Sequence, residues 1–325
     1  MANFDISKYK ELPTFGFQPF GETVVDLSAH PPWDVPKKIA IIVAPTGAFF
    51  SRKQNPHQPY TVDEIIKESI ESVEAGACSV HVHVRDKNGF PSGDRELIKK
   101  VVKALRDRFG ENVHIDGELL FGSTFEEMMN PAIEDLYESA AVNCHAGYIG
   151  DTVDYLPPQT CKATAELLQA LGKKPTMAVY NPGDIDNSYR WLIRTGILKP
   201  PFYWGIVPCM PGCAPMWDPL SMAETLLYLI RRIKDVDEAK QPLIKVCASG
   251  RASSYLITLA IVLGCHVRVG KEDTIYRLPH TNDVIVSNKE IVEQTVSIAR
   301  LLGREPMNAI EYRKATGMRP FSGKL

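Results

Sequence analysis

The chain has 325 residues and a mass of 36.2 kDa; 44% of its residues are hydrophobic, 9% aromatic and 23% charged. This is the composition of an ordinary globular protein, and it excludes collagen-like, coiled-coil and largely disordered chains. The 37 basic and 39 acidic residues give a formal charge of −2, which offers no electrostatic basis for binding nucleic acid or an anionic membrane. We therefore expect a small-molecule partner, and neither nucleic acid nor membrane.

The first 36 residues are rich in proline and aromatic residues and show no periodicity. We expect an N-terminal arm over residues 1–36 and one catalytic domain over residues 37–325. The arm has no core of its own, and it would leave four large aromatic side chains in water: Phe15, Phe17, Phe20 and Trp33. We therefore expect a homo-oligomer, either a homodimer or a homotetramer.

Seven cysteines, an odd number, lie singly along the chain, mostly within apolar runs. Free cysteine in such runs behaves as a small hydrophobic residue, which indicates a reducing compartment. The first 20 residues lack the basic start and apolar core of a secretory signal. We therefore expect a cytoplasmic protein. Cys209 and Cys213 could suggest a metal pair, but their spacing and the lack of a second pair argue against zinc there.

After the arm, apolar runs bounded by turn residues predict eight strands. They are Lys38–Ala44, Cys78–Val84, Asn112–Ile115, Ala140–Cys144, Thr176–Tyr180, Tyr203–Val207, Leu243–Ala248 and His266–Val269. Helical patterns alternate with these strands, and the first begins with a Thr61 cap. They are Val62–Ala75, Asp94–Arg108, Phe125–Ser139, Gln159–Leu171, Ile185–Thr195, Met222–Lys234, Ala252–Leu263 and Lys289–Leu302.

Eight strands, each followed by a helix, predict an α/β fold of the closed (β/α)8 TIM barrel type. A doubly wound open sheet also alternates strand and helix, but it usually has a glycine-rich phosphate turn after its first strand. Here the first strand runs into Ala-Pro-Thr-Gly-Ala at residues 44–48, which is not such a turn. We therefore prefer the barrel.

Two histidines end the second predicted strand, at the position where barrels carry functional residues. Alternation along Ser79–Asp86 places His81, His83 and Arg85 on the side of the barrel axis. Two imidazoles facing one cavity need partners for their ring nitrogens, and a divalent cation provides them. A pair of hydrogen-bonded core histidines is the alternative.

The eighth predicted strand runs into Glu272 and Asp273, and alternation places Glu272 on the same face as Arg268. Strands eight and two both flank strand one, so Glu272 can reach the two histidines. Two histidines and one carboxylate with an open position are the usual ligands of a catalytic zinc. Manganese or iron(II) could use the same set. Ordinary solvated carboxylates are the alternative for Glu272 and Asp273.

Several further stretches form a distinctive set: Ala44–Ala48 followed by Arg52, Asn55, Pro56, Pro59, Thr61 and Glu64; Glu74–Ala77 leading into His81–Asp86; Val179 and Tyr180; Gly250 and Arg251; and Arg268–Asp273. Together they resemble the β-keto acid cleavage enzyme family, over nearly everything after residue 36. The resemblance implies a (β/α)8 barrel with one Zn²⁺ held by His81, His83 and Glu272. It implies conversion of a β-keto acid and acetyl-coenzyme A into acetoacetate and a new acyl-coenzyme A.

By match to the family, Arg268 and Asp273 are the expected catalytic pair. Cleavage between the α and β carbons produces a carbanion-like fragment, and a Lewis acid on the keto and carboxylate oxygens stabilises it. Asp273 is placed to move protons, while Arg268 keeps it ionised or binds the substrate carboxylate. A structural salt bridge is the alternative interpretation of this pair.

The chain departs from the family pattern at three positions. Phe49 stands where the type member has an acidic residue that binds the substrate's amino group, Asp116 stands in place of a serine, and Ala178 in place of a glutamate. Glu118 could supply a displaced carboxylate. We therefore expect a substrate with a neutral or apolar side chain. The expected substrate-binding residues are Phe49, Asp116, Glu118 and Asn143.

The seventh predicted strand ends at Ser249, Gly250 and Arg251, where barrels often bind phosphate through loop amides and a helix N-terminus. We expect these three residues to bind coenzyme A. A glycine turn with a surface arginine is the alternative.

Two other functions compete with acyl exchange. A metal-dependent hydrolase of the amidohydrolase type also uses a His-x-His motif, but on its first strand, and needs further histidines after strands five and six. Those strands end here in Tyr180-Asn181 and Val207-Pro208. A divergent metal-binding barrel, inactive because of Asp116 and Ala178, is the other alternative.

Overall fold

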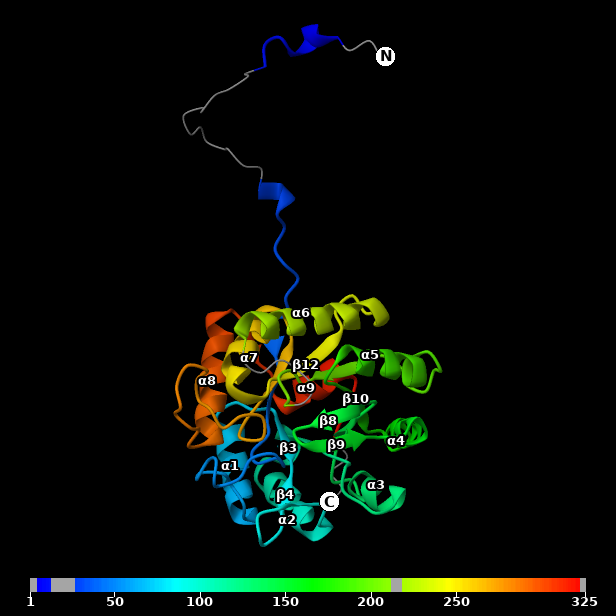
Figure 1. Ribbon diagram of the computed structural model, residues 1–325, viewed down its shortest axis with the longest axis vertical. Helices are drawn as coiled ribbons and strands as arrows, with labels where there is room; N and C mark the ends of the chain where they lie inside the picture. Colours follow the sequence, from blue (N-terminus) through cyan, green and yellow to red (C-terminus); the bar gives the residue numbers. More distant parts are fainter. Residues whose placement is uncertain (1–4, 13–26, 212–217, 322–325) are drawn as a thin grey trace. The chain divides into compact units, whose positions relative to one another are not determined.

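The computed structural model describes residues 5–12, 27–211 and 218–321 of the chain (Figure 1). The chain divides into two compact units, Met1–Val35 and Pro36–Leu325. Within the first unit lie the short 3-10 turns η1 (Ile6–Tyr9) and η2 (Leu27–Ala29). Trp33 is 86% exposed, whereas the other three aromatic residues expected to be in water lie outside the described residues.

Eight parallel strands close into a barrel, which confirms the predicted fold class. Each strand pairs with the next barrel strand along the chain, and the last pairs with the first. The strands are β2 (Ile41–Val43), β3 (Ser79–Val82), β6 (His114–Gly117), β7 (Ser139–Val142), β10 (Lys174–Val179), β11 (Tyr203–Ile206), β12 (Leu243–Cys247) and β13 (His266–Val269).

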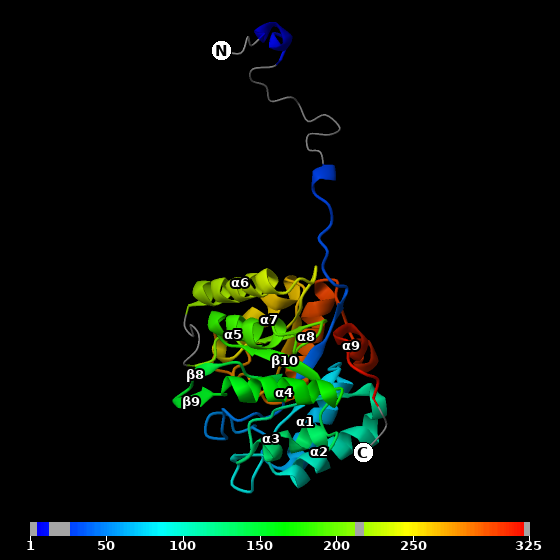
Figure 2. The same cartoon turned by 90° about the vertical axis from the view of Figure 1, so that its right-hand side faces the viewer.

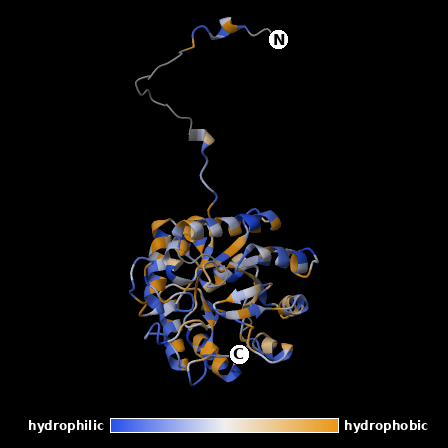
Figure 3. Ribbon diagram, in the orientation of Figure 1, coloured by the Kyte–Doolittle hydropathy of each residue, from blue (hydrophilic) through white to orange (hydrophobic). Residues whose placement is uncertain are grey.

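Eight helices surround these strands in chain order (Figure 1). They are α1 (Val62–Glu74), α2 (Arg95–Phe109), α3 (Phe125–Ile133), α4 (Pro158–Ala170), α5 (Pro182–Ser188), α6 (Pro219–Val236), α7 (Ser253–Val262) and α8 (Asn288–Leu301). Figure 2 shows α5 and α6 side by side on the outside of the barrel. The helices carry hydrophilic and hydrophobic residues together, as expected for helices with one buried face (Figure 3). In the described residues, no helix is long and apolar enough to cross a bilayer.

The main hydrophobic core lies between the strands and the helices. Val80 and Val82 of β3 belong to this core, together with Ile65 of α1 and Val101 of α2. Residues that alternate with the valines point the other way, toward the barrel interior. Sequence alternation therefore determines which side chains reach the axis.

Most predicted boundaries shift by a few residues, and in two elements the shift reflects a change in the path of the chain. The first predicted strand is split: β1 (Lys38–Ile39) pairs with β14 (Glu305–Pro306) outside the barrel, and β2 alone enters it. The third helix ends at Ile133 rather than at Ser139. Asp135 adopts a positive φ of 64° just after it, so the chain turns there and β7 begins at Ser139.

Several small elements were not expected from the pattern. The hairpins β4 (Val84–Arg85) with β5 (Pro91–Ser92) and β8 (Ala146–Ile149) with β9 (Thr152–Tyr155) extend from loops after β3 and β7. The turn Tyr189–Ile193, which continues α5, falls within the predicted helix Ile185–Thr195, but its π-helical geometry was not expected. The helix α9 (Ala309–Thr316) lies near the start of the barrel strands, since its buried Tyr312 hydroxyl is 2.8 Å from that of Tyr203, the first residue of β11.

Two histidines pack around Tyr312 at this end of the barrel, and both start strands. The ring centroids of His114 and His266 lie 5.0 and 6.4 Å from that of Tyr312. His266 Nδ1 accepts a hydrogen bond of 3.1 Å from the backbone N–H of Ala40, which only an unprotonated Nδ1 can do. Burial lowers the pKa of each histidine to about 4.

These two histidines should make stability depend on pH. In the unfolded chain each of these histidines has a pKa of about 6.5, whereas in the folded chain the pKa is about 4. Their contribution to stability is therefore complete above the unfolded value and declines as the pH falls toward 4. Linkage gives a loss of about 2 kcal/mol for each histidine between roughly pH 7 and pH 5.

Urea unfolding of wild type and His266→Gln at these two pH values measures the contribution of His266. The free energy of unfolding of the variant should fall by about 2 kcal/mol less than that of wild type. His280→Gln, at an exposed histidine, is the control and should follow wild type. An equal fall in wild type and His266→Gln would contradict the prediction.

Candidate active site

Two cavities open beside the C-terminal ends of the barrel strands. The first has a volume of about 350 Å³, and its lining includes His81, His83, Lys245 and Arg268. The second has a volume of about 750 Å³ and extends toward the ends of β12 and β13. Phe49, Met210 and Glu272 line both cavities. The two cavities are therefore neighbours, with Glu272 in the wall common to both.

The three predicted metal ligands lie together, with His81 and His83 in the lining of the first cavity beside Glu272. His81 Nε2 is 3.2 Å from His83 Nε2, while the Glu272 carboxylate oxygens lie 3.5 Å from His81 Nε2 and 3.6 Å from His83 Nε2. Glu272 Oε2 is buried and has no hydrogen-bond partner among the described residues. Gly47, with φ of +56°, allows this arrangement, because a Cβ there would lie 2.1 Å from Glu272 Cγ.

The protonation states of His83 and Glu272 suit ligand chemistry, whereas His81 would give up a proton to bind a metal ion. Burial lowers the pKa of His83 to about 4, so its imidazole is neutral near pH 7. Burial also opposes charge on His81, but the carboxylates of Glu272 and Asp116 outweigh it and raise its pKa. Burial would raise the pKa of Glu272, yet Arg268 and the two histidines hold it at about 2. Two imidazoles and an ionised carboxylate with an orphaned oxygen fit a divalent ion such as zinc.

A second carboxyl group, on Glu118, borders the same centre. Ligand atoms of His81, His83 and Glu118 lie within 4.8 Å of one another. Burial raises the pKa of Glu118 to about 7, and its Oε1 accepts a 3.0 Å hydrogen bond from the backbone of Leu119. Glu118 therefore lies where it could contact either a metal ion or a substrate.

The predicted catalytic pair forms a two-pronged ion pair inside the barrel. Arg268 Nε is 3.1 Å from Asp273 Oδ2, Arg268 Nη2 is 2.5 Å from Asp273 Oδ1, and the same nitrogen is 3.1 Å from Glu272 Oε1. Burial raises the pKa of Asp273, although Arg268 opposes this shift. Arg268 lines the first cavity and Asp273 the second, so the pair connects them.

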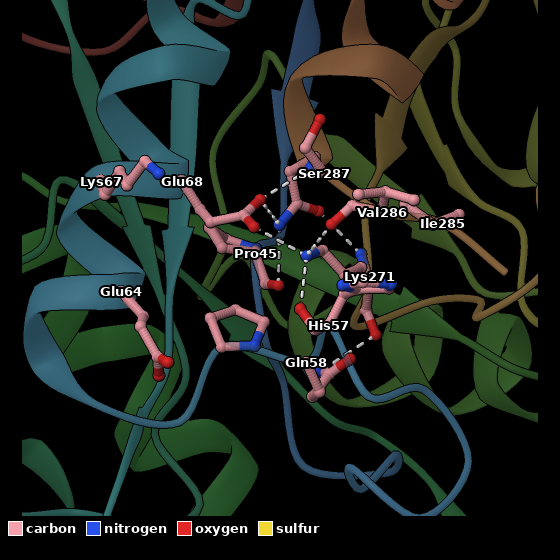
Figure 4. A network of polar contacts seen from close by, with 12 residues as sticks. Pro45, His57, Gln58, Glu64, Lys67, Glu68, Lys271, Ile285, Val286 and Ser287 are labelled. Atoms are coloured by element: carbon pink, nitrogen blue, oxygen red, sulfur yellow. Dashed lines mark hydrogen bonds and ion pairs between the residues drawn. The ribbon is translucent and has the colours of Figure 1, made fainter.

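A polar network fixes the loop that carries Glu272 and Asp273, as Figure 4 shows. Lys271 Nζ donates to Glu68 Oε1 at 2.8 Å, to the His57 carbonyl at 2.7 Å and to the Val286 carbonyl at 3.0 Å. Its backbone N–H donates to Asn288 Oδ1 at 2.9 Å. Residues from three parts of the chain thus hold the loop in place.

Asp116 and Lys245 meet in the barrel interior. Asp116 Oδ2 is 2.9 Å from His81 Nδ1 and 3.1 Å from Lys245 Nζ, and its Oδ1 accepts from the Ser139 hydroxyl. Burial would raise the pKa of Asp116, but Lys245 and His81 hold it well below its usual range. Sequence reasoning missed Lys245, although a lysine within the apolar run Leu243–Cys247 is a signal of a functional or paired charge.

The other expected site residues occupy varied positions. Phe49 is 45% exposed at the junction of the cavities. Asn143 is buried and its Oδ1 lacks a partner among the described residues, but it is not among the lining residues of either cavity. Arg85 does not join the histidines, because it lies in the hairpin strand β4; its guanidinium donates to the carbonyls of Gly89, Phe50 and Thr46.

The expected coenzyme A residues, Ser249, Gly250 and Arg251, line the second cavity. The Arg251 guanidinium contacts the Thr281 carbonyl and Asn282 Oδ1 and lies 3.7 Å from the Tyr276 ring centroid. The Gly250 N–H donates to the Asp273 carbonyl at 2.8 Å. The Ser249 hydroxyl is buried without a partner among the described residues. Cys213, of the rejected cysteine pair, lies outside the described residues.

Comparison with known proteins gives the family. Residues 38–318 match the model of the β-keto acid cleavage enzymes. The chain belongs to this family. It is 30% identical over 288 residues to the 3-keto-5-aminohexanoate cleavage enzyme of Fusobacterium nucleatum, covering 87% of this chain and 99% of that protein. It is 24% identical to the 3-oxoadipate:acetyl-CoA acetyltransferase of Cupriavidus necator, covering 86% of this chain and 94% of that protein.

Among solved structures, ObcA in a binary complex with oxaloacetate superposes with a TM-score of 0.68. The match covers 81% of this chain and 68% of ObcA, at 16% sequence identity. At this identity the likeness supports the barrel fold alone.

Proposed function

We propose that this family member exchanges acyl groups between a β-keto acid and acetyl-coenzyme A. The β-keto acid R–CO–CH₂–COO⁻ and acetyl-coenzyme A would give acetoacetate and R–CO–coenzyme A. The carboxymethyl fragment passes from one acyl group to the other, so atoms and charge balance. The observation that carries the proposal is the pair of neighbouring cavities that share Glu272, with the two histidines beside it.

In this proposal His81, His83 and Glu272 hold one Zn²⁺ per chain. The ion would act as a Lewis acid toward the keto and carboxylate oxygens of the substrate. The orphaned Glu272 Oε2 and the two facing Nε2 atoms support a cation at this position. The β-keto acid would occupy the first cavity, which these side chains line.

Arg268 and Asp273 would handle charge and protons. The Arg268 guanidinium lines the first cavity and can bind a substrate carboxylate or keto oxygen. Asp273 lines the second cavity, where the thioester would lie, and can accept or return a proton there. Coenzyme A would extend along Ser249, Gly250 and Arg251. The Gly250 amide and the Arg251 guanidinium already have hydrogen-bond partners in the protein. The placement of coenzyme A therefore rests on the position of these residues in the cavity wall, and not on phosphate binding by them.

An assay for acetoacetate tests the proposal. Purified protein should form acetoacetate from acetyl-coenzyme A in the presence of one member of a panel of β-keto acids, and only when both substrates are present. Hydrolysis without coenzyme A would favour the amidohydrolase alternative. A metal-bound protein inactive on the whole panel would favour the divergent barrel.

We also propose that the chain acts as a homodimer or homotetramer in the cytoplasm. The 86% exposure of Trp33 in the arm supports assembly. The described cysteines, all buried and free of disulfides, support a reducing compartment.

Phe49 predicts selectivity for a neutral substrate side chain. An ammonium group placed against this half-exposed ring gains only a weak cation–π contact of about 0.5–1 kcal/mol, whereas each methylene packed there contributes roughly 0.8 kcal/mol. Wild type should therefore have a higher kcat/KM for a β-keto acid with a neutral acyl chain than for its amino-substituted analogue. Phe49→Glu should shift the ratio toward the amino compound.

Glu118→Gln is the matched variant for this measurement, because Glu118 lines the first cavity beside the histidines and, unlike Asp116 and Glu272, is not paired with Lys245 or Arg268. Its ratio should stay close to that of wild type. A wild-type preference for the amino compound that Glu118→Gln abolishes would show that Glu118 replaces the missing carboxylate.

A further inference from the structure

We infer that Asp116 is a positioning residue of the proposed metal centre. Its carboxylate holds His81 with Nε2 free to bind the ion, and Lys245 supplies the compensating positive charge from the opposite side of the barrel. This inference rests on the proposed metal site and assigns Asp116 a role other than the substrate contact expected from the sequence.

The strand register places Asp116 beside His81. The two residues are direct partners on the parallel strands β3 and β6. Their side chains are each 3% exposed, and His81 Nδ1 lies 2.9 Å from Asp116 Oδ2. Because the carboxylate can only accept, Nδ1 must carry the hydrogen. A neutral His81 therefore has its lone pair on Nε2, the atom that faces His83 and Glu272.

Lys245 explains how a carboxylate can remain charged at this depth. β12, which carries Lys245, is four strands away from β6 in the closed barrel, so the contact crosses the interior. The Lys245 side chain is 5% exposed, and its Nζ lies 3.1 Å from Asp116 Oδ2 and 5.6 Å from the centroid of the Tyr203 ring. A buried carboxylate needs such a partner, since an unpaired buried charge is strongly unfavourable.

Ser139 completes the setting of the carboxylate. Ser139 on β7 is the strand-register partner of Asp116 on β6, and its hydroxyl donates a hydrogen bond to Asp116 Oδ1. Both oxygens of Asp116 are thus engaged by neighbouring side chains. Side chains from three strands contact the Asp116 carboxylate, so it can fix the orientation of the His81 ring. Carboxylates that bind the second nitrogen of a histidine ligand generally strengthen metal affinity.

Zinc affinity of the full-length protein, measured by competition with a chromophoric chelator, tests the inference. Asp116→Asn keeps the shape but removes the charge, and it should weaken zinc binding about 10- to 100-fold. The visible spectrum of the cobalt(II)-substituted variant should differ from that of wild type, because the imidazole orientation changes. Should Asp116→Asn fail to fold with Lys245 unpaired, Asp116→Asn/Lys245→Met removes both charges and should show the same weakening.

Asp184→Asn is the matched control. Asp184 also holds a buried histidine, with Oδ1 2.9 Å from His145 Nδ1, but His145 is not in the candidate centre. This variant should bind zinc within about twofold of wild type. If Asp116→Asn binds zinc as tightly as wild type, the inference is wrong but the proposed metal site is unaffected. The same conclusion follows if Asp116→Asn and Asp184→Asn weaken zinc binding equally. A wild type without zinc affinity would overturn both the metal site and the inference.

Discussion

Asp273→Asn is expected to lower kcat on the order of 10²- to 10⁴-fold while the protein keeps its metal ion. The amide cannot accept a proton, and removal of an acid/base group costs a factor of this size. Metal should remain because Asp273 directs both carboxylate oxygens at Arg268 rather than at the histidines. Arg268→Ala should cause a loss of similar size, because Asp273 and Glu272 both depend on its guanidinium.

Turnover, metal content and unfolding should be measured together on these variants. Glu138→Gln makes the same carboxylate-to-amide change in another buried arginine pair, where Arg313 Nε lies 2.5 Å from Glu138 Oε2. Glu138 directly precedes β7, so it lies at the N-terminal end of this strand, whereas the cavities lie at the C-terminal ends of the strands. This control should therefore lower stability and leave turnover near that of wild type. Near-normal turnover in Asp273→Asn and Arg268→Ala would reduce the pair to a structural salt bridge.

The barrel was predictable because its signals are local. Eight apolar runs alternate with amphipathic helices, and the capping box of Thr61 and Glu64 marks the start of α1 within one residue. The helix at 125–139 was predicted too long because its apolar pattern continues past Ile133, whereas the backbone turns at Asp135. Helix α9 was missed because it follows the repeated unit and is stabilised by contacts of Tyr312 with distant strands.

The candidate centre was predictable to the extent that it depends on strand alternation. His81, His83 and Glu272 converge because β13, β2 and β3 are adjacent and their C-terminal ends meet. Lys245 depends on which side chains meet across the barrel interior, and the spacing along one strand contains no such information. The contact of Lys271 with Glu68 joins residues 203 positions apart, so no local pattern could reveal it.

Arg251 illustrates a different limit of sequence reasoning. A glycine followed by arginine at a strand end is compatible with phosphate binding. In the structure, the guanidinium lies over the Tyr276 ring and binds the Thr281 carbonyl. The partners come from a loop after β13, whose path is set by tertiary contacts. The motif therefore locates the cavity wall without determining what the arginine binds.

His81→Ala/His83→Ala should lose the metal ion that wild type is expected to carry at one per chain. Without both imidazoles, Glu272 remains as the single proposed ligand, and one carboxylate already bound to Arg268 does not hold zinc. Loss of a Lewis acid worth several kcal/mol should lower kcat on the order of 10³-fold or more. Elemental analysis and the acetoacetate assay measure the two effects on the same preparation.

His145→Ala separates ligation from general damage to the barrel. His145 is as buried as His81 and is paired with Asp184 in the same way, but it does not belong to the ligand group of His81, His83 and Glu118 in the described residues. If His81 and His83 act as ligands, this control keeps its metal even where its stability falls, and the double variant loses metal even where it remains folded. A wild type that is free of metal yet fully active would instead show that the two histidines are a hydrogen-bonded core pair, with the charge of Glu272 balanced by Arg268 alone.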